Sequence, residues 1–132
     1  SIFEMDERVY TVSIHCQKNF PLRKANSNLD KGLEVGTTDE IYLDQLDRTL
    51  LEISKVPADL LVYNAGVDIH ENDTLGHLKV SSTGIILREK KVVDFVIKRG
   101  LPLIVTMGGG YQKDIANLAN LHSIIFRDIQ SR

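Results

Sequence analysis

The sequence has one cysteine, no tryptophan and no long uninterrupted run of apolar residues. The single cysteine, Cys16, excludes an intrachain disulfide and a cysteine-rich metal site. No apolar run approaches the roughly 20 residues that a transmembrane helix requires. Neither sign of charge dominates, because 16 Lys and Arg residues stand against 18 Asp and Glu residues. The chain therefore has no electrostatic footprint for nucleic acid or for an anionic membrane.

What is present is ordinary for a soluble globular protein. Of the 132 residues, 42% are hydrophobic and 26% are charged. A chain of this length fits one domain and can bury one sizeable core. Glu4 and Asp6 lie among the first residues and no apolar segment follows them, so we expect no signal peptide. We expect a cytoplasmic protein, or a nuclear one if the source is eukaryotic.

Segments of strand character alternate with segments of helical periodicity. Strands are predicted over 8–15, 59–66 and 101–106, and helices from 37–40 to before Pro57, from 81 or 82 to 99, and over 111–127. Thr37 and Glu40 have capping-box spacing, and Gly100 stands where a helix would stop. The residues 16–36 have weak periodicity and are predicted to form a long loop.

This order predicts an α/β fold of three layers, α/β/α, with a mainly parallel sheet and right-handed crossovers. The apolar run in 59–66 is continuous, which favours a parallel strand covered on both faces. The predicted helices carry apolar stripes, and these are expected to face the sheet: Leu43, Leu46, Leu50 and Ile53; Ile85, Ile86, Val92, Val93, Val96 and Ile97; Ile115, Leu118, Leu121 and Ile125.

Ligands of open parallel sheets bind beyond the carboxyl ends of the strands, so residues there are candidates for chemistry. Asp68 follows the second strand, where a carboxylate can bind a cation, hold a catalytic partner or make a loop hydrogen bond. His70, Asp73 and His77 follow it, but without a typical metal-ligand spacing. We therefore expect the two histidines to be structural or exposed.

The third strand ends in Gly108-Gly109-Gly110-Tyr111. Glycines permit positive φ angles and a close backbone approach to a ligand, and they could cradle a phosphate at a helix N-terminus. They match neither the dinucleotide fingerprint nor a Walker motif, which weakens a nucleotide-binding interpretation. Tyr111 either points its phenol into the cleft, where it could stabilise an oxyanion, or packs at a helix start. Cys16 and His15 are adjacent in a strand and point to opposite sides, so we expect Cys16 to be non-catalytic.

Taken together, these motifs resemble the histone deacetylase family. The residues 64–76 resemble the motif Gly-Ala/Thr-Asp-x-x-x-x-Asp-Arg-Leu-Gly, and 80–84 resemble the family's serine-containing helix start. Gly108 to Tyr111 matches its glycine-rich turn and tyrosine. The pieces Phe20-Pro21 and 36–40, with the Gln-Lys after Tyr111, look most like the class IV type and its bacterial relatives. The order and the intervals agree over essentially the whole chain.

The resemblance implies an arginase/deacetylase fold and zinc-dependent removal of acyl groups from acetyl-lysine or small acylated amines. It makes Asp68 a zinc ligand and Tyr111 the catalytic tyrosine that polarises the substrate carbonyl. It places Leu75, Gly109 and Gly110 on the wall of the acyl-lysine tunnel. By the same resemblance, Ser13 and Ile14 supply oxygens to a structural monovalent cation, usually potassium. His70 falls at a variable position, Met107 stands where many relatives have glycine, and Thr74 replaces the common arginine.

The family's other two zinc ligands and its paired histidines belong to motifs that this sequence does not contain. One carboxylate does not complete a three-ligand catalytic zinc site. We therefore expect 1–132 to be the C-terminal portion of a deacetylase domain, inactive alone. The alternatives are a non-catalytic fragment or interaction module that self-associates through exposed core surface, and, less favoured, a Rossmann-like nucleotide binder.

Overall fold

A computed structural model describes residues 2–132 and contains four short strands and three helices within them. The strands are β1 (Val12–Cys16), β2 (Leu29–Leu33), β3 (Leu61–Asn64) and β4 (Leu103–Thr106). The helices are α1 (Asp39–Ile53), α2 (Ser82–Arg99) and α3 (Ile115–Gln130). The predicted α/β class with parallel strands is confirmed.

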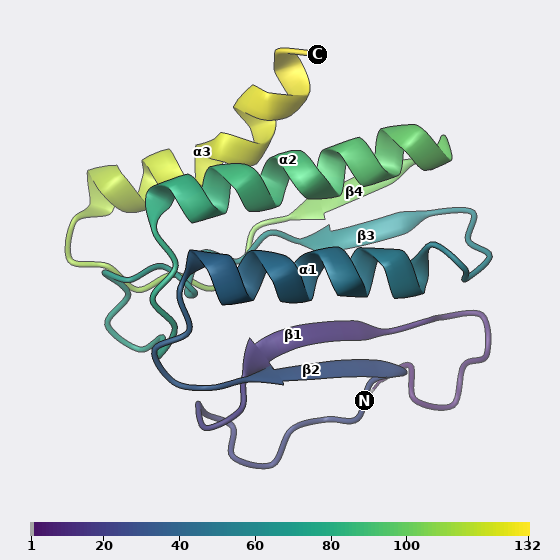
Figure 1. Ribbon diagram of the computed structural model, residues 1–132, viewed down its shortest axis with the longest axis horizontal. Coiled ribbons are helices and arrows are strands. Elements are labelled where there is room, and N and C mark those ends of the chain that lie inside the picture. Colours follow the sequence, from purple (N-terminus) through teal and green to yellow (C-terminus); the bar gives the residue numbers. More distant parts are fainter. Residues whose placement is uncertain (1) are drawn as a thin grey trace.

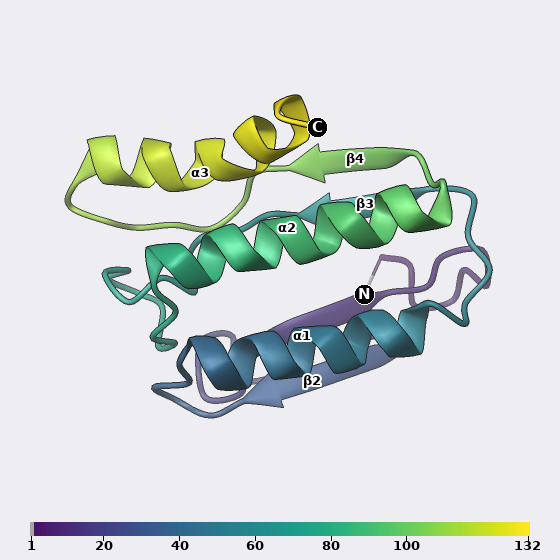
Figure 2. The same cartoon turned by 45° about the horizontal axis from the view of Figure 1, so that its top comes forward.

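The strands form two parallel pairs, β1 with β2 and β3 with β4. Figures 1 and 2 show β2, β3 and β4 pointing the same way, with the three helices running alongside them. Because paired strands are parallel, the loops that follow β3 and β4 leave from the same edge. This arrangement is what brings the candidate residues after each strand together.

The prediction of a continuous loop over 16–36 is wrong, because β2 lies inside it. Its sequence, Leu-Asp-Lys-Gly-Leu, has only two apolar residues, so its strand character comes from pairing with β1. The Asn28 side chain accepts from the backbone N–H of Thr11 at 2.8 Å and fixes where the pairing begins. β1 itself begins at Val12, not at Arg8, and includes Cys16, which packs in the core.

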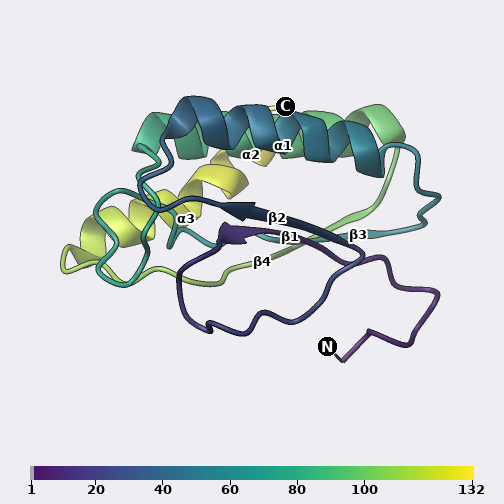
Figure 3. The same cartoon turned by 60° about the horizontal axis from the view of Figure 1, so that its bottom comes forward.

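The helices α1 and α2 lie side by side on one face of the strands (Figure 3). The core forms on this face, where α2 buries four of its predicted residues, Ile85, Val92, Val93 and Val96, and α3 buries Leu121 and Ile125. Ile86, Ile97 and Ile115 are exposed, contrary to prediction. On α1 the buried residues are Tyr42, Leu46 and Thr49, while Leu43, Leu50 and Ile53 are half-buried.

The opposite face of β3 and β4 is open in the described part of the chain. Val62 and Ile104 are partners in the strand register, and they are 62% and 48% exposed. Leu60 precedes Val62 by two residues and is exposed too. Residues alternate between the two faces of a strand, so the continuous apolar run of β3 serves one covered face and one uncovered face. The prediction that β3 is covered on both faces is therefore wrong for residues 2–132.

The predicted helix ends are confirmed for α1 and α2, whereas the capping box of α1 and the start of α3 are wrong. Ser81 caps α2 by accepting from the backbone N–H of Gly84, and Gly100 ends it at φ 64°. Thr37 and Glu40 form no capping box, because the Thr37 hydroxyl donates to the Glu34 carbonyl at 2.7 Å. The helix α3 begins only at Ile115, with the Asp114 side chain as its cap, so Tyr111 lies in a loop and not at a helix start.

A buried ion pair on α2 forms hydrogen bonds with β3 and with the loop that follows it. Arg88 and Glu89 are 3% and 1% exposed and form a salt bridge with each other. The Tyr63 hydroxyl donates to Glu89 Oε2 at 2.7 Å, and burial raises the pKa of this phenol well above its ordinary value. Arg88 Nη1 donates to the Gly66 carbonyl at 2.6 Å.

Among residues 2–132, no helix combines the length and apolarity needed to cross a bilayer.

We predict that Glu89→Leu lowers the free energy of unfolding by about 3–5 kcal/mol, because it leaves Arg88 buried without its partner. The double variant Arg88→Met/Glu89→Leu should lose less than the single variant, since no unpaired charge remains buried. As a control, Lys91→Met breaks the surface ion pair with Asp47 and should cost less than about 1 kcal/mol. Urea unfolding followed by circular dichroism measures all three. A double variant less stable than Glu89→Leu would contradict the prediction.

Candidate functional site

Two loops at the carboxyl ends of β3 and β4 carry the candidate residues. Asp68 lies in the loop after β3, and Tyr111 lies in the loop between β4 and α3. The two loops touch at the glycine turn and along the backbone of Tyr111. The predicted convergence of the Asp68 and Tyr111 loops is therefore confirmed. The chemical roles assigned to the two residues remain predictions.

The glycine turn lies directly over the Asp68 carboxylate. A Cβ atom on Gly109 would be 2.6 Å from Asp68 Cγ, and Gly109 has φ +60°. A residue with a side chain would collide with the carboxylate and adopt a strained backbone, so glycine is required here. The turn places a negative charge where a phosphate would bind, and α3 starts four residues after Tyr111, at Ile115. The arrangement disfavours the nucleotide-binding alternative.

The charge environment of Asp68 favours a cation. The residue is exposed as a whole, but desolvation beneath the turn raises the pKa of its carboxyl above 3.8, and the Asp73 carboxylate raises it further. The positive charge of Arg88 and the ring of His122 act in the opposite direction. A positive ligand would stabilise the ionised form of Asp68 by the same Coulombic effect.

Asp73 joins the two loops. Its side chain is buried and accepts from the backbone N–H groups of Leu75 at 2.9 Å, Gly76 at 2.6 Å and Tyr111 at 2.6 Å. The backbone N–H of Thr74 donates to the Tyr111 carbonyl at 2.9 Å, so the peptide groups on both sides of Tyr111 are held. With three backbone donors on its two oxygens, Asp73 acts as a loop-bonding residue and is poorly placed to pair with Asp68 at a metal.

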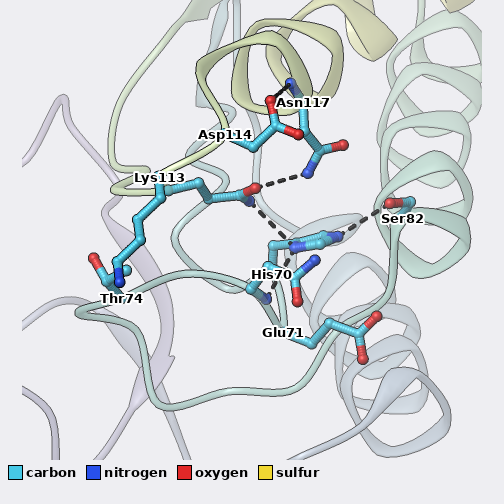
Figure 4. A pocket seen from close by; sticks show the side chains of 9 residues that line it. His70, Glu71, Thr74, Ser82, Lys113, Asp114 and Asn117 are labelled. Carbon is cyan, nitrogen blue, oxygen red and sulfur yellow. Dashed lines mark hydrogen bonds between the residues drawn. The ribbon is translucent and has the colours of Figure 1, made fainter.

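The two histidines of this loop behave as predicted. His77 is exposed. His70 is 2% exposed, and both of its ring nitrogens make hydrogen bonds to protein groups, so neither is free for a metal. Figure 4 shows His70 bonded to Ser82 beside a polar cavity of about 380 Å³. Around that cavity lie the first turns of α2 and α3.

The two loops carry exposed apolar groups, of which Met107 and Tyr111 border the same cavity as the glycine turn. Tyr111 is 57% exposed, and Leu75 and Met107 are exposed as well. The Asn19 side chain donates to the Leu75 carbonyl at 3.1 Å, which brings the segment of exposed Phe20 to the same place. These are suitable walls for the apolar part of an acyl chain. The sequence predicted Leu75 as a substrate-contacting residue but not Phe20. The position of Phe20 near Leu75 depends on a hydrogen bond between loops that are far apart in the sequence.

Sequence reasoning also missed His122. It borders a cavity of about 250 Å³ together with Met107, Gly108, Gly109, Gly110 and Tyr111. Its Nδ1 is buried and makes no hydrogen bond within residues 2–132. The periodicity of α3 contained the signal, because 122 lies four residues after Leu118 and three before Ile125, on the face that packs inward.

Ser13 and Ile14 lie in the middle of β1, away from the glycine turn in sequence and in a different strand pair. The Ser13 hydroxyl is 2.8 Å from His15 Nδ1, and Ile14 packs against the core that also contains Val67 and Ile69. The predicted role of Ser13 and Ile14 as potassium ligands remains a prediction.

The residues present do not by themselves fit a catalytic zinc ion. Such a site needs three protein ligands, and residues 2–132 contain no group of three His, Cys, Asp or Glu side chains suited to a metal. Asp73 already accepts hydrogen bonds from three backbone N–H groups. Of the two carboxylates, Asp68 is therefore the one that a metal could use. Among residues 2–132, Asp68 is thus the candidate ligand that this site leaves open.

Comparison with proteins of known structure shows the same fold elsewhere. An acetylpolyamine aminohydrolase from Burkholderia pseudomallei superposes with a TM-score of 0.74 at 19% identity over 89% of this chain and 36% of its own. A histone deacetylase homologue in complex with SAHA gives 0.73 at 18% over 92% of this chain and 34% of its own. These similarities confirm the arginase/deacetylase fold.

Comparison of sequences identifies the family. An uncharacterized protein of Picosynechococcus is 42% identical over 127 residues, which are 96% of this chain and 42% of that protein. Histone deacetylase 2 of Arabidopsis thaliana is 38% identical over 117 residues, 86% of this chain and 30% of its own length. The chain thus spans less than half the length of these relatives. Residues 1–126 match the histone deacetylase domain, and the chain therefore belongs to the histone deacetylase family.

Proposed function

We propose that residues 1–132 form the C-terminal portion of a zinc-dependent deacylase domain and contribute its phenol and one metal ligand. The observation that carries this proposal is the contact between the two loops, in which Gly109 lies on the Asp68 carboxylate and Asp73 holds the backbone of Tyr111. The reaction is amide hydrolysis, in which water adds to the acyl carbon and the amine leaves.

Tyr111 is suited to stabilise the oxygen of the acyl group as negative charge develops on it. Its phenol is a hydrogen-bond donor, it is partly exposed at the opening, and its backbone is fixed on both sides. A fixed donor aimed at a developing oxyanion contributes more to the transition state than to the ground state. Leu75, Gly109 and Gly110 would form the wall along the acyl-amine chain, and Phe20 could add to it, since its neighbour Asn19 bonds to Leu75.

The substrate class that we propose is an acetylated lysine side chain or a small acylated amine. The names of the relatives support this class, since one is an acetylpolyamine aminohydrolase and one binds SAHA. Both substrates present an amide at the end of a narrow alkyl chain, which suits an opening lined by apolar side chains and glycine backbone.

We further propose that Asp68 supplies one ligand of the zinc ion and that polypeptide beyond these 132 residues supplies the others. The isolated chain would then lack tight zinc binding and turnover, because one carboxylate does not form a catalytic zinc site. Ser13 and Ile14 are proposed to contribute oxygens to a potassium site in the complete domain.

The first test of this function is Tyr111→Phe in a polypeptide that extends the chain to the full length of the family domain. The substitution removes only the hydroxyl, so kcat for an acetyl-lysine peptide should fall about 10²–10³-fold, with KM changed little. Tyr10→Phe is the matched control, because it removes the same atom from an exposed tyrosine outside the site. A Tyr111→Phe enzyme within threefold of the unmodified one would refute the role of the phenol.

The second test is the metal content of the two polypeptides after dialysis against micromolar zinc. The 132-residue chain should retain far less than one equivalent of zinc and show no deacetylation. The extended polypeptide should retain one equivalent and lose most of it on Asp68→Ala. Asp73→Asn is unsuitable as a control because it disturbs the loop, so His77→Ala serves instead. Stoichiometric zinc with turnover in the 132-residue chain would overturn the proposal that it holds only part of a site.

A second candidate function, self-association, is favoured by the uncovered face of β3 and β4. Val62 and Ile104 are register partners, and Leu60 extends the same exposed apolar row. An exposed apolar row tends to associate with another apolar surface in water. When the chain is alone in solution, the apolar surface available to it is the same row on a second copy of the chain. We propose that the 132-residue chain forms a homodimer through this face.

Size-exclusion chromatography with light scattering should therefore give a dimer for the 132-residue chain. Ile104→Lys should convert it to a monomer, because the interface would have to bury a charge. Leu51→Lys, which adds the same charge at an exposed position of α1, should leave the dimer intact. A monomeric unmodified chain, or equal effects of the two lysines, would exclude this interface.

A further inference from the structure

The loops of Asp68 and Tyr111 are joined at a second point, on the side away from the opening. His70 is 2% exposed and Gln112 is 7% exposed. Gln112 Nε2 donates to His70 Nδ1 at 3.2 Å, and the backbone N–H of Asn72 donates to the same nitrogen at 3.1 Å. Two donors on Nδ1 assign it as the acceptor of a neutral ring, so the ring proton is on Nε2.

The network extends from this histidine to both neighbouring helices. His70 Nε2 lies 3.0 Å from the Ser82 hydroxyl in the first turn of α2, the contact drawn in Figure 4. Gln112 Oε1 accepts from the Asn117 side chain in the first turn of α3 at 2.7 Å. His70 therefore connects the loop after β3 and the start of α2 with the residue that follows Tyr111.

This network bears on the site because Gln112 directly follows Tyr111 in the chain. Asp73 fixes the N–H of Tyr111, and the His70–Gln112 bond fixes the residue immediately after it. With the backbone held at Tyr111 and at the next residue, the Cα–Cβ bond from which the exposed phenol projects has a fixed direction.

We propose that His70 is a positioning residue for Tyr111: through its hydrogen bond with Gln112 it holds the phenol in the direction needed at the substrate carbonyl. This inference rests on the proposed deacylase function. It assigns no contact between His70 and the substrate, because His70 is buried behind the loop.

Two substitutions at His70 separate positioning from space filling. In His70→Asn, the amide oxygen stands near the former Nδ1 and retains an acceptor for Gln112. In His70→Gln, the longer amide reaches toward Ser82 and offers no acceptor in the place of Nδ1. The neighbouring cavity of about 380 Å³ gives either side chain room to be accommodated. Gln112→Glu removes the donor from the other end of the same bond, and His77→Gln is the control in the same loop.

The first readout is hydrogen exchange of the Tyr111 and Asn72 amides in the 132-residue chain, measured by NMR. We expect His70→Gln and Gln112→Glu to speed exchange about three- to tenfold, the effect of losing one hydrogen bond. His70→Asn should recover most of the protection, and the double variant His70→Gln/Gln112→Glu should resemble either single one. Thermal unfolding is recorded in parallel, and Gln112→Glu carries the test if His70→Gln does not fold.

The second readout is catalysis by the extended polypeptide. His70→Gln should lower kcat about three- to tenfold with KM unchanged, and His70→Asn should recover most of it. Equal exchange and equal kcat for the Asn and Gln variants would show that His70 only fills space and would overturn the proposal. If the unmodified extended polypeptide has no deacylase activity, the proposed function fails, while the exchange measurements still decide whether His70 positions the loop.

Discussion

The hydrogen bonds of the buried Asp73 carboxylate are the contact on which the site depends. One side chain binds the backbone N–H groups of Leu75, Gly76 and Tyr111, and so it shapes its own loop and attaches the neighbouring loop to it. Charge-assisted bonds of this kind are stronger than neutral ones, and none of their donors is free to rotate. Burial raises the pKa of Asp68, and the same negative charge raises it further. The feature that builds the site therefore also makes its second carboxylate receptive to a cation.

Behind these loops, Arg88 and Glu89 connect helix packing with the geometry of the turn. The Arg88 guanidinium reaches the Gly66 carbonyl, two residues before Asp68, while Glu89 binds the Tyr63 hydroxyl of β3. A buried ion pair contributes little net stability compared with apolar packing, but it permits only a few side-chain arrangements. Its value here is that α2, β3 and the loop that carries Asp68 share one fixed set of hydrogen bonds.

Sequence reasoning predicted those parts whose information is local. The span of α2, its Ser81 cap and its Gly100 stop follow from residues next to one another, and they are confirmed. β2 was missed because its five residues acquire strand structure only by pairing with β1. The capping box at Thr37 failed because the helix is capped at Thr38 and the Thr37 hydroxyl donates instead to the Glu34 carbonyl. His122 and Phe20 were missed because their places at the site depend on packing between distant segments.

The bonds that shape the two loops come from a short stretch of the chain. Gly66, His70, Asp73, Arg88, Gln112 and Asn117 all lie between β3 and the first turn of α3. These bonds join the two loops from within residues 66–117, while Asn19, Gly36 and Asp39 bond to the segment that follows β3. The row of exposed Val62 and Ile104, on β3 and β4, with Leu60 just before β3, lies in the same stretch or next to it, but nothing within residues 2–132 covers it. In the proposed deacylase domain, further polypeptide would therefore have two tasks, to add metal ligands and to cover this face of the sheet.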